Sequence, residues 1–229
     1  MSFVSSTTPN LNIFFMLYNY CERSGSGLFD EPVNLLTNLS FIVAAAFVYL
    51  LLRDRGQFNP GNILLLTLVV FIGIGSALFH SFATEWARLL DVVPILLYQL
   101  AFLWLYMQRV AQLGTFSRVA LAGGFLLVSL YALSFKGVLN GSVMYLPAIL
   151  SVMAVAVFHY SRKKIEPMLG WYALLVFALS LFFRTLDVAL CPVWPLGTHF
   201  VWHLLNGVLL YLTSRIIIVN SGLQQADRL

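Results

Sequence analysis

The sequence predicts an all-α, polytopic membrane protein, folded as a seven-transmembrane-helix bundle. Hydrophobic residues make up 60% of its 229 residues, charged residues only 10%, and the mean hydropathy is +0.88. Soluble domains carry about 25% charged residues. In addition, seven apolar stretches are each close to the roughly 20 residues that cross a bilayer as a helix. We therefore expect a single membrane domain with short connections.

The seven predicted spans are residues 32–52, 61–82, 86–107, 116–135, 141–161, 168–188 and 198–219. The gap between the second and third spans, around "FATEW", is very short, so we expect these two helices to be antiparallel neighbours. Residues 1–31 are expected to form an extracytoplasmic or interfacial segment. Residues 32–219 form the transmembrane domain, and residues 220–229 form a polar C-terminal tail.

The basic residues predict the orientation of the bundle. Nine lie at the C-terminus or at the connections on its side, and four lie on the other side. Because positive charge favours the cytoplasm, we expect the C-terminus inside and the N-terminus outside. Since topology explains the net charge of +4, we expect no nucleic-acid partner. The nine are Arg53, Arg55, Arg109, Arg118, Arg162, Lys163, Lys164, Arg215 and Arg228; the four are Arg23, Arg88, Lys136 and Arg184.

The chain has two cysteines, and both fall on the predicted outer side. Cys21 lies in the N-terminal segment, and Cys191 lies in the connection between the sixth and seventh spans. Disulfides persist on the oxidising side of a membrane. We favour a disulfide between them over two free thiols, and it would hold the N-terminal segment beside the start of the seventh span.

Polar residues of the second and third spans are predicted to share one depth. "GIGSALFH" ends the second span and places Ser76 and His80 four residues apart, on one helical face. "RLLDVVP" opens the third span, and Asp91 lies about as far after the turn as His80 lies before it. Taken singly, Ser76 could bond to its own helix, His80 could be interfacial, and Asp91 could pair with Arg88.

The seventh span adds two histidines at the same depth. His199 and His203 in "THFVWHLLNG" are four residues apart, one or two turns below the predicted outer surface. Three histidines, an aspartate and a serine from three helices therefore converge. Three imidazoles with an open fourth position are the ligand set of a catalytic zinc ion. The sequence thus predicts zinc held by His80, His199 and His203.

Asp187, in "FRTLDVALCP" at the end of the sixth span, has two interpretations of nearly equal weight. It could accept a hydrogen bond from a ligand histidine and fix its tautomer. Alternatively, it could form an ion pair with Arg184, three residues earlier.

The N-terminal segment contains a group of acidic residues. Glu22, Asp30 and Glu31 lie within ten residues, in a glycine-containing stretch. Clustered oxygen ligands suit a hard cation such as calcium. A solvated acidic turn is the simpler interpretation, with Glu31 favourably placed at the start of the first helix.

Together, these motifs resemble a known family. "YCE…EPVNLLTNLS", "GIGSALFHSF", "LLDVVPI" and "THFVWHLLNG" resemble the alkaline ceramidases, over essentially the whole chain and in matching order. The superfamily of seven-span hydrolases also includes adiponectin-receptor-like proteins. The resemblance implies hydrolysis of the ceramide amide to a sphingoid base and a fatty acid, with zinc held by three histidines. It also implies a structural calcium ion near the N-terminus, and a disulfide between this segment and the last connection.

The resemblance also implies roles for individual residues. His80, His199 and His203 would be the zinc ligands, Asp91 would orient and deprotonate the attacking water, and Ser76 would stabilise the oxyanion. The positions matching the calcium site are Asn19, Tyr20 (through its carbonyl), Glu22, Ser24 and Glu31. Here the chain departs from the family pattern, in which an acid is typical at position 19 and an asparagine at position 24. Arg23 also adds a positive charge, and the segment before Glu31 is shorter.

We therefore expect a zinc-dependent intramembrane amidase whose ceramide-like substrate enters from the bilayer, with the active site near the extracytoplasmic side. Two alternatives are a seven-span receptor or regulator with a structural zinc ion, and a related hydrolase acting on another N-acyl lipid. A retinal protein is excluded, because it needs a lysine in the seventh span. The three lysines are Lys136, Lys163 and Lys164.

Overall fold

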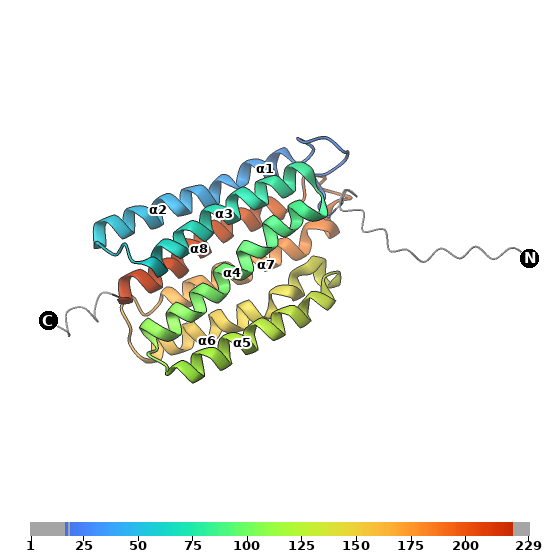
Figure 1. Cartoon of the computed structure of the whole chain (residues 1–229). Helices are drawn as coiled ribbons and strands as arrows, with labels where there is room; N and C mark the ends of the chain where they lie inside the picture. Colours follow the sequence, from blue (N-terminus) through green and yellow to red (C-terminus); the bar gives the residue numbers. More distant parts are fainter. Residues whose placement is uncertain (1–16, 18, 222–229) are drawn as a thin grey trace, which may run out of the picture.

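The computed structural model of the chain describes residues 17 and 19–221 and shows a bundle of helices running side by side (Figure 1). Every regular element of these residues is helical, as predicted. Most of the predicted N-terminal segment and nearly all of the polar tail at 220–229 lie outside the described residues.

Seven helical stretches are long and apolar enough to cross a membrane, which confirms the predicted number of spans. Short helical turns extend or divide several of them. The first span is α1 (Pro32–Thr37) with α2 (Leu39–Arg55), the second is α3 (Pro60–Phe82), the third is α4 (Glu85–Leu105) with a π-helical turn (Tyr106–Val110), and the fourth is α5 (Thr115–Ala132) with a 3₁₀ turn (Leu133–Phe135). The fifth is a 3₁₀ stretch (Val138–Tyr145) with α6 (Leu146–Ser161), the sixth is α7 (Leu169–Leu190), and the seventh is α8 (His199–Ser221).

Helix α8 is the central element of the bundle. It packs against α2 and α7 and also contacts α1, α3 and α4. The seventh span accordingly has the largest buried share of the seven. The start of α1 and the end of α8 lie at opposite ends of the bundle (Figure 1), as an odd number of spans requires. The predicted orientation relative to the membrane stays a prediction.

Helices α3 and α4 form the most extensive contact between elements and are antiparallel neighbours, as the short connection predicted. Ala83 ends α3 with a left-handed backbone (φ 45°), and Thr84 precedes α4 in an extended one. Gly75 lets the two backbones touch, because a Cβ atom there would lie 1.9 Å from the carbonyl oxygen of Leu90. This close approach brings the helix segments carrying Ser76 and Asp91 together.

A disulfide joins Cys21 to Cys191, which confirms the pairing favoured from the sequence. It fastens the N-terminal segment to the residue that follows α7. The backbone N–H of Cys21 also donates to the carboxylate of Asp187 (3.2 Å). The N-terminal segment is therefore held at the end of the bundle where α8 begins.

Candidate active site

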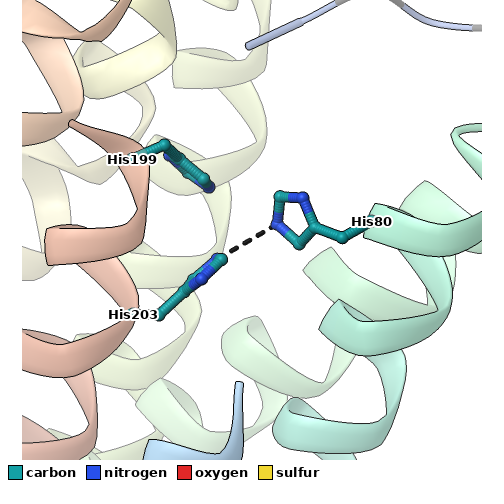
Figure 2. Close-up of side chains that lie close together, drawn as sticks. All are labelled: His80, His199 and His203. Carbon is teal, nitrogen blue, oxygen red and sulfur yellow. Dashed lines mark hydrogen bonds between the residues drawn. The ribbon is translucent and has the colours of Figure 1, made fainter. Parts of the chain in front are cut away.

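Three buried histidines meet at one end of the bundle. His80 lies in the last turn of α3, and His199 and His203 lie in the first turns of α8. One ring nitrogen from each lies within 4.8 Å of the others. Figure 2 shows the rings pointing toward a common centre from the two helices, with the Nε2 atoms of His80 and His203 3.0 Å apart. The structure thus assembles the three residues that the sequence predicted as metal ligands.

Asp187 fixes the start of α8 rather than a histidine ring. Its Oδ1 atom accepts hydrogen bonds from the backbone N–H groups of Thr198 (2.6 Å) and His199 (2.9 Å). A carboxylate at this position stabilises a helix N-terminus. Both interpretations made from the sequence are therefore wrong in detail. Asp187 contacts the main chain of His199, and it forms no ion pair with Arg184 among the described residues.

Glu31 orients His80. Its Oε2 atom lies 2.5 Å from Nδ1 of His80, and its Oε1 atom accepts a hydrogen bond from Arg23. Burial by itself raises the pKa of Glu31, but the hydrogen bonds from His80 and Arg23 outweigh it and lower the pKa below its ordinary value. Glu31 is therefore a carboxylate, which accepts the Nδ1 proton and leaves Nε2 of His80 with its lone pair.

Thr37 holds His203 in the same way. Its hydroxyl lies 2.8 Å from the carbonyl oxygen of Val33 and 3.0 Å from that of Asn34, so its single proton is directed to the helix. The hydroxyl oxygen then accepts from Nδ1 of His203, 2.9 Å away. This interaction also leaves Nε2 of His203 as an acceptor.

His199 is held by stacking. Its ring lies 3.7 Å from that of Tyr20, with an angle of 19° between the planes. Its Nδ1 atom is buried and has no hydrogen-bond partner in the described part of the chain. A buried polar atom without a partner is costly, so such an atom needs an explanation.

The cluster fits a metal ion. The Nε2 atoms of His80 and His203 face each other 3.0 Å apart, and a ring nitrogen of His199 lies within 4.8 Å of a ring nitrogen of each, so one ion could contact all three rings. Neutral imidazoles whose other nitrogen is bonded to a carboxylate or a hydroxyl are typical zinc ligands. Among the residues the structure describes, this is the only such group of histidine, cysteine or acidic side chains.

A polar cavity of about 310 Å³ opens beside the cluster. Ser76 and Asp91, the two residues predicted to take part in catalysis, line it together with His199 and His203. Asp91 does not belong to the cluster itself. A carboxylate and a hydroxyl therefore face the same space as two of the three histidines, as the shared depth predicted.

Arg184 is a cavity residue whose place the sequence did not indicate. Its guanidinium lies 5.0 Å from the ring centroid of Trp202 and 5.5 Å from that of Tyr145, within cation–π range. It also contacts the hydroxyl of Tyr20 and is close enough to Asp91 for an electrostatic interaction. The one sequence signal for Arg184 is its position three residues before Asp187, about one helical turn away on α7.

A second, narrow apolar cavity lies next to the first. The two share Tyr145 and Trp202, and most of the apolar cavity is walled by aromatic and aliphatic side chains from α2 to α8. Phe102, Phe125 and Phe177 are among these side chains. The two cavities therefore adjoin the same two aromatic side chains.

The structure gives no support to the predicted calcium site. Glu22 caps α1, accepting from the backbone N–H groups of Val33 (2.7 Å) and Asn34 (2.8 Å), and Glu31 is bonded to Arg23 and His80.

The other three members of that set lie at the polar cavity or at the surface. Asn19 and Tyr20 line the polar cavity, and Ser24 is exposed. The alternative interpretation, a solvated acidic turn, is also wrong for Glu31, because this residue is only 2% exposed. Glu31 can be buried because the guanidinium of Arg23 supplies a positive charge beside its carboxylate.

Comparison with known proteins agrees with this arrangement. No curated protein matches the chain significantly. The family model described as Ceramidase matches residues 17–228, which is nearly the whole chain. The family acts on the amide bond of ceramide, and the seven spans, the histidine cluster and the polar cavity fit such an intramembrane hydrolase. The chain therefore belongs to the Ceramidase family and is a ceramide-hydrolysing enzyme.

Proposed function

We propose that the enzyme is a zinc-dependent intramembrane amidase that releases a sphingoid base and a free fatty acid. The observation that carries this proposal is the buried cluster of His80, His199 and His203 beside a cavity lined by Asp91. Zinc held by the three histidines would act as a Lewis acid that polarises the amide carbonyl and makes water nucleophilic at neutral pH.

Asp91 is the proposed general base and acid. Its carboxylate would accept a proton from the attacking water and later return a proton to the leaving amine. Two features support this role. Asp91 lines the cavity together with His199 and His203, and it is not a member of the histidine cluster that would hold the metal.

Ser76 is the proposed donor to the developing oxyanion. It lies one turn before His80 on the same face of α3, and it lines the same cavity as Asp91. A hydroxyl directed at the oxygen of the tetrahedral species stabilises the transition state more than the substrate. By analogy with other such donors, its removal should cost about 3 kcal/mol in activation free energy.

The apolar cavity is the proposed site for an acyl chain. It adjoins the polar cavity at Tyr145 and Trp202, which line both, and the rest of its lining is mostly apolar. A lipid amide could then lie at the histidine cluster while its chain stays in an apolar environment. We further propose that this end of the bundle faces the extracytoplasmic side, because most basic residues lie at the other end.

Elemental analysis and a lipid panel test the proposal together. Purified protein should hold about one zinc ion per chain, as expected for a single three-histidine site. His203→Ala should lose it, whereas His159→Ala, at a buried histidine outside the cluster, should retain it. The wild type should release sphingoid base and fatty acid from ceramide. Full zinc content in His203→Ala would refute the ligand set, and preference for another N-acyl lipid would refute the proposed substrate.

A further inference from the structure

Arg23 forms a buried ion pair in the N-terminal segment. Its side chain is 0% exposed and that of Glu31 is 3% exposed, with Nε and Oε1 2.5 Å apart. Removing a charge pair of this kind from water is costly, so it persists only with close geometry and further hydrogen bonds. The surroundings of Arg23 supply such bonds.

The guanidinium gathers oxygen atoms from two parts of the chain. Nη2 donates to the carbonyl oxygen of His80 (2.6 Å), at the end of α3. Nη1 lies 3.5 and 3.4 Å from the carbonyl oxygens of Gly25 and Gly27 in the N-terminal segment. A carboxylate and several carbonyl oxygens around one positive charge are the surroundings that a hard cation such as calcium selects.

The other acidic side chains of the segment are already bonded to main-chain donors. Both oxygens of Glu22 accept N–H groups at the start of α1, and Oδ2 of Asp30 accepts the N–H of Gly27 (2.5 Å). Asn34 turns its amide N–H, rather than its oxygen, toward Glu31 (3.1 Å). In the described part of the segment, the carboxylates of Glu22, Asp30 and Glu31 are therefore each already bonded to donors of the chain.

We propose that Arg23 is the built-in cation of this segment, taking the place of the divalent ion that the family resemblance implies. Its planar guanidinium directs several N–H groups at once, so one side chain joins the N-terminal segment, Glu31 and the end of α3. Through Glu31 it also holds His80 in position. The folded enzyme consequently needs no calcium.

Melting temperatures of the purified full-length protein test this proposal. The wild type should melt at the same temperature in a calcium chelator and in calcium at about 10 mM, which exceeds the weakest dissociation constants of protein calcium sites. Arg23→Ser leaves Glu31 buried without its partner, so it should lower the melting temperature by roughly 10 °C.

Matched variants complete the test. Arg53→Ser removes an arginine whose side chain is 61% exposed, and it should leave the melting temperature unchanged. If Arg23→Ser cannot be purified, Arg23→Lys keeps the charge but loses the planar fork, and it should melt several degrees below the wild type.

Two results would overturn the proposal. One is a rise in the wild-type melting temperature with calcium, and the other is an Arg23→Ser variant as stable as the wild type. Neither measurement depends on hydrolysis, so failure here is distinguishable from failure of the proposed amidase function.

Discussion

At the scale of single residues, the histidine cluster was predictable but the residues that orient its rings were not. His80, His199 and His203 could be brought together from topology alone, because their distances from the helix ends give their depth. A carboxylate partner for a histidine was also expected, but it was sought at Asp187, twelve residues before His199. The partner of His80 is Glu31, from a segment 49 residues away, and sequence spacing carries no information on such a contact.

Asp91→Asn tests the division of roles within the site. The amide keeps the shape of the side chain but cannot accept the proton of water, so turnover of ceramide should fall by about 10²–10⁴-fold. Zinc content should stay at the wild-type level, because Asp91 lies outside the cluster. Asp54→Asn, at an exposed carboxylate (66%), serves as the control for turnover and zinc content. Unchanged turnover in Asp91→Asn would exclude the proposed general base.

At the scale of elements, apolar length and short connections were sufficient to predict the spans. All seven exist, and their ends differ from the prediction by a few residues. What could not be predicted is irregular backbone inside apolar stretches. The π-helical turn at Tyr106–Val110 and the left-handed residues at 139–141 depend on packing between helices and leave no pattern in the hydrophobicity.

Gly75→Ala tests whether the contact between α3 and α4 positions the site. The added methyl group would overlap the carbonyl of Leu90, so the helices must separate, at a cost of about 1–3 kcal/mol. The melting temperature should fall by several degrees. Turnover should fall by up to about 100-fold, because Ser76 and Asp91 move apart.

Gly123→Ala is the matched control, since nothing lies within 4 Å of the position that its added methyl group would take on α5. Alanine favours a helix over glycine by about 1 kcal/mol, so this variant should be as stable as the wild type or slightly more so. Equal behaviour of the two variants would mean that the close approach at Gly75 has no role in the site.

At the scale of the whole molecule, one ion pair lies far from the histidine cluster, so its effect on stability can be measured apart from catalysis. Glu166, in the connection between α6 and α7, forms an ion pair with Arg215 of α8 at the end opposite the histidine cluster. The hydrogen bond from Arg215 lowers the pKa of Glu166 below its ordinary value. The carboxylate therefore contributes stability above its unfolded-state pKa, and this contribution is lost as the pH falls through the lower folded-state pKa.

Glu166→Gln should lower the stability of the protein without changing its catalytic activity. Because both side chains are partly exposed, the free energy of unfolding at neutral pH should fall by about 0.5–1 kcal/mol, or roughly 1–4 °C in melting temperature. The difference from the wild type should shrink below about pH 4.3, the ordinary value for glutamate. Zinc content and turnover at neutral pH should not change. A difference that grows on acidification would contradict the assignment.

Hydrolysis of ceramide after removal and return of zinc tests the central claim most directly. Purified wild-type protein in detergent should lose release of sphingoid base when a chelator removes its metal, and stoichiometric zinc should restore it. His203→Ala should show no restoration under the same conditions. Hydrolysis at the full rate by protein shown to be free of metal would contradict the account.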